Sequence, residues 1–149
     1  MSLILKIGIS KYKESATGTY YHLYNRGNQK MKIFRDKNDY QIYLKKLVRA
    51  VNKFGFLLIA YCLMPNHAHL ILKQMENYSP SKLISSLHTS YAMIFNKKYN
   101  LVGHVFQDRF KQRIIDNDDY MLNLICYLHL NPVKDNLCKT PDLYPWSSY

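Results

Sequence analysis

Two histidines separated by one residue, His67 and His69, have a spacing that suggests chemistry. They follow the sequence Met64-Pro-Asn66, which predicts a turn, and they begin an alternating stretch that predicts a β-strand. Side chains two residues apart on a strand project from the same face, so the two imidazoles would lie side by side. Because imidazole binds several divalent ions, the pair predicts half of a metal site. Two unconnected surface histidines are the alternative interpretation.

A tyrosine and an asparagine, Tyr127 and Asn131, lie four residues apart in a segment with helical periodicity. On a helix this spacing places the two side chains one above the other on the same face. We expect the helix to start within Asp116–Asp119 and to stop at Asn131, because Pro132 disfavours helical geometry in the residue before it. The phenol and the carboxamide could form the solvent side of this helix. Beside the histidine pair, they could instead be a nucleophile and an oxygen ligand.

These four side chains match the requirements of phosphodiester cleavage. The reaction needs a nucleophile and stabilisation of the charge on the phosphate oxygens. A divalent ion held by His67, His69 and the Asn131 amide oxygen could polarise the phosphate. Tyr127 could then attack phosphorus and give a covalent phosphotyrosine with a free 3′-hydroxyl.

The composition favours a polyanionic partner. Lysine and arginine total 21 against 10 acidic residues, a formal charge of +11, and such an excess promotes phosphate contacts. The 14 tyrosines and six phenylalanines offer faces on which unpaired bases could stack. A basic protein whose tyrosines lie mostly in the core is the alternative. The three cysteines form no CxxC pair, so neither a disulfide framework nor a zinc knuckle is predicted.

A chain of 149 residues has room for one domain, so we predict a single catalytic domain over residues 1–149 with residues 1–18 as a variable lead-in. We find neither a signal peptide nor a membrane-spanning stretch, which predicts a cytoplasmic, nucleoid-associated protein without a membrane partner. Periodicity predicts elements in the order β-α-β-β-α-β-α. Their predicted ranges are 20–26, 37–54, 56–63, 67–73, 79–98, an extended segment or short hairpin within 103–115, and 116–131. This order is typical of an α+β fold of the ferredoxin-like or RRM-like type, an antiparallel sheet with helices packed on one face.

Four segments in this order resemble the HUH single-tyrosine transposases, and most closely the REP-associated tyrosine transposase branch of the insertion-sequence-200 type. The segments are HLYNRG (His22–Gly27), YCLMPNHAHL (Tyr61–Leu70), GHVFQDRF (Gly103–Phe110) and YLHLNPV (Tyr127–Val133). The resemblance extends from about Tyr20 to Tyr149. Ala68 is small for the middle position of the histidine pair, and Asp108 stands where relatives often have glycine.

The resemblance implies an RRM-like fold and cleavage of single-stranded DNA near a hairpin through a 5′-phosphotyrosine intermediate. It implies dependence on Mg²⁺ or Mn²⁺ and no small-molecule cofactor. By position, His67 and His69 match the metal-binding histidines, Tyr127 the nucleophile, and Asn131 a third ligand carried on a helix. Related transposases can dimerise and complete each site with the partner's helix, whereas the REP-associated branch can act as monomers, so a homodimer stays open.

Further residues are weaker candidates. The basic residues of the matched segments could bind DNA phosphates or form a solvated basic face: Arg26, Arg109, Lys111 and Arg113. The rival nucleophiles are Tyr91, Tyr99 and Tyr120, and His104 and His129 could be extra ligands, although a structural or DNA-contact role is favoured for both. Two other functions were weighed: an RRM-like nucleic-acid-binding module without catalysis, and a zinc hydrolase with a distant third histidine.

Overall fold

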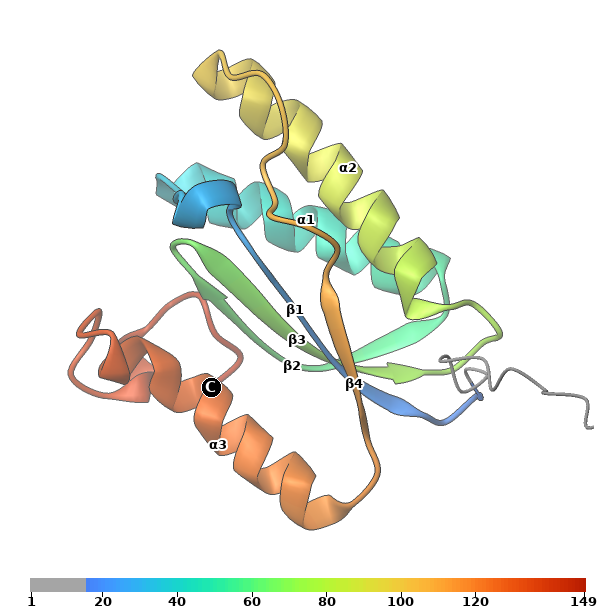
Figure 1. Ribbon diagram of the computed structural model, residues 1–149. Coiled ribbons are helices and arrows are strands. Elements are labelled where there is room, and N and C mark those ends of the chain that lie inside the picture. Colours follow the sequence, from blue (N-terminus) through green and yellow to red (C-terminus); the bar gives the residue numbers. More distant parts are fainter. Residues whose placement is uncertain (1–15) are drawn as a thin grey trace, which may run out of the picture.

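A four-stranded antiparallel sheet forms the centre of the computed structural model, which describes residues 16–149 (Figure 1). Its strands are β1 (Tyr20–Arg26), β2 (Phe56–Met64), β3 (His67–Gln74) and β4 (Lys111–Ile115). The helices are α1 (Lys37–Lys53), α2 (Pro80–Tyr99) and α3 (Asp118–Lys134), with short 3-10 helices at Asn28–Lys30 and Pro141–Leu143. Most of the predicted lead-in, residues 1–15, lies outside the described residues. Within the described part, no helix is both long and apolar enough to cross a bilayer.

The strands are ordered β2-β3-β1-β4, so β1 lies in the interior of the sheet and β4 at one edge. β1 pairs with β3 on one side and with β4 on the other, and β2 and β3 form a hairpin. The predicted α+β fold with an antiparallel sheet is confirmed. The pairing sets the register that matters below, in which Tyr24 is opposite His69 and His22 is opposite Arg113.

Helices α1 and α2 cover one face of the sheet (Figure 1). The start of α1 is fixed by a capping box, in which Asp36 accepts from the Asp39 backbone and Asp39 accepts from the Asp36 backbone. The buried Asp39 carboxylate also binds the Lys98 ammonium at 2.7 Å and the Tyr99 hydroxyl at 2.7 Å. Because Lys98 and Tyr99 end α2, these contacts tie the first turn of α1 to the last turn of α2.

Helix α3 lies on the opposite face, which differs from the expectation that the helices share one face (Figure 1). The reason is that this face of the sheet also carries apolar side chains, including Cys62 and Ile71, and Leu124 and Leu128 of α3 pack on them in a second core. The face that a simple RRM-like sheet would leave open is therefore partly covered.

Helix α3 also continues past the predicted stop at Asn131, through Pro132, to Lys134. A proline removes the hydrogen bond that its own N–H would donate, and here only the final residues of the helix follow it. The helix end is closed by the Asp135 backbone N–H, which donates to the Asn131 carbonyl, and by Leu137, which donates to the Pro132 carbonyl. The expectation of a stop at Asn131 overestimated the effect of Pro132 so close to the helix end.

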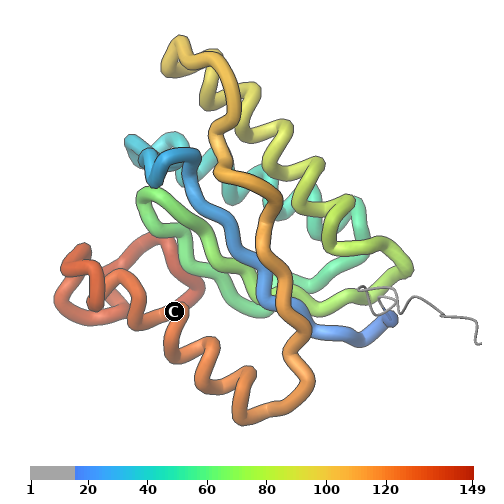
Figure 2. Tube along the Cα trace, viewed as in Figure 1, coloured from blue at the N-terminus to red at the C-terminus, as the bar shows by residue number. Residues whose placement is uncertain are grey.

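The C-terminal segment turns back along β2, as the red end of the tube shows (Figure 2). The backbone N–H of Leu63 donates to the Trp146 carbonyl, and that of Ser148 donates to the Tyr61 carbonyl. The Trp146 ring stacks on Tyr40, with ring centroids 4.4 Å apart. These contacts cover the end of the β2 edge near Tyr61–Leu63, whereas β4 forms the opposite edge of the sheet.

Candidate active site

The paired histidines begin β3 and project from the face of the sheet on which α3 lies. Ala68, between them, is buried in the core on the α1 and α2 side, as strand alternation requires. The His67 and His69 rings have centroids 5.0 Å apart and are nearly perpendicular. The sequence therefore predicted correctly that the two imidazoles share one face.

In each of these histidines, Nδ1 takes part in a hydrogen bond. Within residues 16–149, Nε2 of neither ring has a hydrogen-bond partner. The Nδ1 of His67 lies 2.6 Å from Oδ1 of Asn66, an oxygen that can only accept, so this nitrogen donates. The Nδ1 of His69 lies 3.0 Å from Nε2 of His22. In a neutral imidazole with a protonated Nδ1, the Nε2 lone pair is available to a ligand.

Burial keeps the histidine cluster neutral near pH 7. Burial, together with the neighbouring His67 and His22, lowers the pKa of His69 to about 3. Burial and the positive charge of Arg113 lower the pKa of His22 to about 4. Burial also lowers the pKa of His67, although the carboxylate of Asp135 opposes this effect. Neutral imidazoles are the form that binds metal ions.

Tyr127 lies beside the histidine pair, on α3. Its ring packs edge-on against His69 with the centroids 5.9 Å apart, and 43% of the residue is exposed. The Lys134 ammonium lies 5.2 Å from the centroid of the Tyr127 ring. An exposed phenol between an imidazole and a cation is reachable by a phosphate group from solvent.

The rival tyrosines occupy other environments. Tyr91 is buried, and its hydroxyl donates to the Ile33 carbonyl. Tyr99 is the last residue of α2, and its hydroxyl donates to Asp39 on the face away from α3. Tyr120 belongs to α3, where its ring packs at the border of the second core. Among the described tyrosines of α3, only Tyr127 has an aromatic contact with the paired histidines.

Asn131 lies one turn beyond Tyr127 on α3, and only 7% of it is exposed. Its Nδ2 is buried without a hydrogen-bond partner in the described structure. The preceding turn of the helix carries Tyr127 against His69, and the following residue on this stripe, Asp135, exerts its charge on His67. A buried amide without a partner is costly unless a ligand satisfies it, and rotating the amide by 180° places its oxygen where the nitrogen now lies.

Two site residues were not assigned a role from the sequence. His22 hydrogen-bonds to His69, and Tyr24 stacks against both rings, with its centroid 5.5 Å from that of His22 and 5.4 Å from that of His69. The alternation of His22 and Tyr24 along β1 was visible in the sequence, but their position depends on the pairing of β1 with β3.

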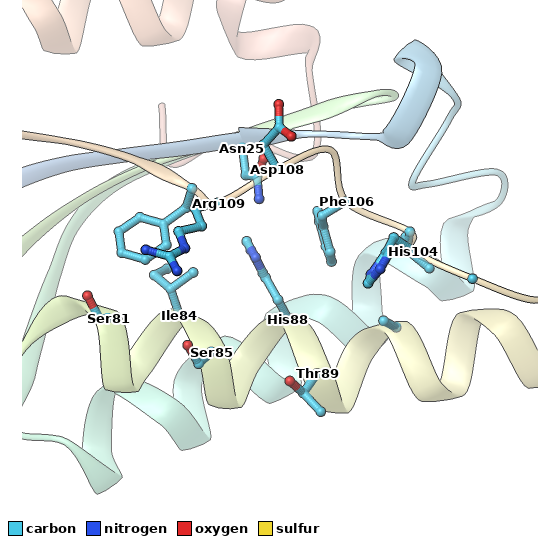
Figure 3. Close-up of a pocket in the computed structure, with 14 residues that line it drawn as sticks. Asn25, Ser81, Ile84, Ser85, His88, Thr89, His104, Phe106, Asp108 and Arg109 are labelled. Carbon is cyan, nitrogen blue, oxygen red and sulfur yellow. The ribbon is translucent and has the colours of Figure 1, made fainter.

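The four candidate basic residues divide between two faces. Arg113 acts on His22, Lys111 lies over the Tyr24 ring, and Arg26 acts on His67, so these three lie near the histidines. Arg109 lies instead near α2, on the other side of the sheet (Figure 3). The two weaker ligand candidates lie away from the paired histidines. His104 lines a cleft beside α2 together with Arg109, and His129 packs against Tyr149.

Within residues 16–149, no three histidine, cysteine, aspartate or glutamate side chains are grouped so that they could hold a metal ion. An ion at His67 and His69 would therefore need a ligand of another chemical type. A zinc hydrolase built on three such ligands finds no support in this part of the chain.

The family model for IS200-like transposases matches residues 15–131, which contain the paired histidines His67 and His69 as well as Tyr127 and Asn131. This chain belongs to the IS200-like transposase family. The family resemblance predicted from four short segments is thus confirmed.

A curated relative agrees with the family assignment. A Haemophilus influenzae protein assigned as a REP-associated tyrosine transposase is 30% identical over 107 residues, which cover 64% of this chain and 60% of the relative. The chain thus spans about 60% of the length of that curated relative.

Two solved structures share the fold. The structure of a REP-associated tyrosine transposase bound to a REP hairpin matches with a TM-score of 0.75 and 21% identity, over 95% of this chain and 83% of that one. A protein of Deinococcus radiodurans assigned as a transposase matches with a TM-score of 0.57 and 14% identity, over 80% of this chain and 95% of that one. At these identities the likeness concerns the fold.

Proposed function

We propose that this chain cleaves and rejoins single-stranded DNA near hairpins, with Tyr127 as the nucleophile and a divalent ion at His67 and His69. The observation that carries the proposal is the position of Tyr127, exposed on α3 with its ring 5.9 Å from that of His69. Membership of the IS200-like transposase family and the formal charge of +11 support a DNA substrate. The likeness to a structure bound to a REP hairpin supports a hairpin.

In the proposed step, the Tyr127 hydroxyl oxygen forms a bond to phosphorus while the bond from phosphorus to the 3′-oxygen breaks. The phenolic proton passes to solvent and the 3′-oxygen takes up a proton. The products are a 5′-phosphotyrosine and a free 3′-hydroxyl. The phosphotyrosine ester replaces one phosphodiester bond with another, so a 3′-hydroxyl can attack it and rejoin the strands without a separate energy source.

The residues present fit a divalent ion. His67 and His69 would hold it through Nε2, and the unpartnered Asn131 amide would supply an oxygen. Two imidazoles with one amide oxygen suit Mn²⁺ better than Mg²⁺, which prefers oxygen ligands, so we expect Mn²⁺ to support the reaction best. When bound, the ion would polarise the phosphate and stabilise its developing charge.

His22 acts in this proposal as a positioning residue for His69. An ion at Nε2 of His69 selects the tautomer in which Nδ1 donates to Nε2 of His22. Replacing His22→Phe removes that acceptor, and we expect it to weaken Mn²⁺ binding by about 10- to 100-fold, measured by titration calorimetry. His22→Gln, which keeps an acceptor, should recover part of the affinity. Unchanged Mn²⁺ affinity in His22→Phe would show that His22 does not orient the ligand.

Tyr127 and His69 contact each other within one chain, so we propose that the site is complete in a single protomer. Mixing Tyr127→Phe protein with His69→Ala protein should therefore give no covalent adduct, because neither chain holds both parts. Recovery of adduct in the mixture, measured on denaturing gels, would instead indicate that α3 completes the site of a partner.

The test of the function itself is adduct formation. The protein is incubated with single-stranded oligonucleotides that carry hairpins, in the presence of Mn²⁺, and a denaturation-resistant protein–DNA species is expected. A nucleic-acid-binding module without catalysis would bind the oligonucleotides and give no such species. That alternative is less favoured because α3 covers part of the sheet face that an RRM-like module uses.

A further inference from the structure

A second cleft lies between α2 and the loop before β4, on the face of the sheet opposite Tyr127 (Figure 3). Its volume is about 540 Å³, within the range of sites that bind small organic groups. The loop wall is formed by residues 103–110, and the floor includes Asn25 of β1. The proposed cleavage site uses none of these residues.

The walls of the cleft carry polar groups. Ser81, Ser85 and Thr89 lie four residues apart along α2, so their hydroxyls form one stripe that lines it. Asn25 is 8% exposed and uses Oδ1 to accept from the Arg26 backbone at 2.8 Å. Its amide nitrogen is turned toward His88 and is left for a ligand (Figure 3). An amide that lines a cavity and keeps a free donor can form a hydrogen bond with a ligand.

Aromatic rings form part of the same wall. His88 stacks on Phe106 with centroids 3.9 Å apart and planes 12° apart. Burial lowers the pKa of His88 to about 3, so the ring is neutral near pH 7. The Phe110 ring also lines the cleft. Flat rings of this kind stack with nucleobases of any sequence.

One cationic side chain, Arg109, lines the cleft. The Arg109 side chain reaches from the loop toward Ile84 and Ser85 of α2, whereas the Asp108 carboxylate points away from α2 (Figure 3). Asp108 has a φ of +50°, in the left-handed region that favours glycine. The turn at Asp108 directs Arg109 into the cleft, where its guanidinium can bind a phosphate.

We propose that this cleft binds one unpaired nucleotide of the DNA, with the base among Asn25, Ser85 and Thr89 and a phosphate at Arg109. The inference rests on the proposed function, since it assumes the same single-stranded substrate. A DNA strand can connect the two sites because β4 is an edge strand of the sheet and carries Lys111 and Arg113 on the Tyr127 side. The strand passes over β4 from one face to the other, with basic residues along its path.

The test combines protein variants in which a tryptophan fills the cleft with DNA in which single bases are removed in turn. A hairpin oligonucleotide with an unpaired flank is compared with versions in which one flank nucleotide at a time is abasic, by fluorescence anisotropy without divalent ions, so that no cleavage occurs. In the wild-type protein, one abasic position should weaken binding by about tenfold, the scale of one base contact. Ser85→Trp, which fills the cleft from an exposed position, should bind the intact oligonucleotide about tenfold more weakly. In that variant the same abasic position should then change the affinity by less than about twofold.

Thr89→Trp should repeat this result, and thermal unfolding checks that both variants are folded. Met93→Trp is the matched control, because Met93 lies on the same helix, is 69% exposed and does not line the cleft. It should give the wild-type abasic profile. An unchanged profile in Ser85→Trp and Thr89→Trp, or an equal loss in Met93→Trp, would overturn the inference. If the wild-type protein forms the Tyr127 adduct but the tryptophan variants keep the wild-type abasic profile, the nucleotide site is wrong and the proposed function stands. If the wild-type protein binds none of these DNAs, the nucleotide site and the proposed function are both wrong.

Discussion

Replacing Tyr127→Phe is expected to abolish the covalent protein–DNA adduct and to lower strand cleavage by on the order of a thousandfold or more. The change removes one oxygen from a residue that is 43% exposed, so the fold should be unaffected. It removes the only atom through which the ring could bond to phosphorus. Cleavage is measured on denaturing gels with a labelled hairpin oligonucleotide and Mn²⁺, and the adduct is seen as a labelled protein band.

Tyr120→Phe is the matched control, because Tyr120 is on the same helix, two turns from Tyr127, and has no aromatic contact with the paired histidines. It should cleave at the wild-type rate and form the adduct normally. DNA binding by Tyr127→Phe should also stay close to wild type, since only the nucleophile is lost. Adduct formation by Tyr127→Phe would assign the nucleophile to another residue.

Loss of the proposed metal ligands is expected to have the second large effect. A chelator should stop cleavage by the wild-type protein, and added Mn²⁺ should restore it. His67→Ala and His69→Ala should each lower the cleavage rate by on the order of a hundredfold or more, and excess Mn²⁺ should restore little of it. The reason is that each change removes one of two imidazoles whose Nδ1 hydrogen bonds hold Nε2 ready for the ion.

His129→Ala provides the control for these variants, since His129 belongs to α3 but packs against Tyr149 rather than the histidine pair. Its chelator sensitivity and Mn²⁺ response should match those of the wild type. Cleavage that continues in the presence of the chelator would show that the reaction needs no divalent ion. The paired histidines would then require another role, such as direct contact with the phosphate.

Local patterns in the sequence were sufficient for the parts of the site that lie on one element. Strand alternation predicted that His67 and His69 share a face, and helix periodicity predicted that Tyr127 and Asn131 share a stripe. These relations depend on residues two or four positions apart, so they are fixed once the element forms. The contact between Tyr127 and His69 depends on tertiary packing, and the sequence suggested it through the chemistry of the residue types and the family resemblance rather than through a local pattern.

Features that depend on pairing between distant segments could not be predicted. The hydrogen bond from His69 to His22 follows from the register of β1 on β3, a separation of 47 residues along the chain. The side of the sheet occupied by α3 follows from the apolar residues that β2, β3 and β4 leave uncovered, including Ile115. The expected extended segment 103–115 becomes a strand only from Lys111, because Asp108 turns the backbone between Phe106 and β4.

The most direct test of the central claim identifies the amino acid that carries the DNA. The adduct formed with Mn²⁺ is treated with nuclease and trypsin, and the modified peptide is sequenced by mass spectrometry. Cleavage after Arg113 and Lys134 yields one peptide that contains both Tyr120 and Tyr127, so fragment ions must separate the two. The proposal predicts a nucleotide 5′-phosphate on Tyr127. A nucleotide on Tyr120 or on any other residue would contradict it.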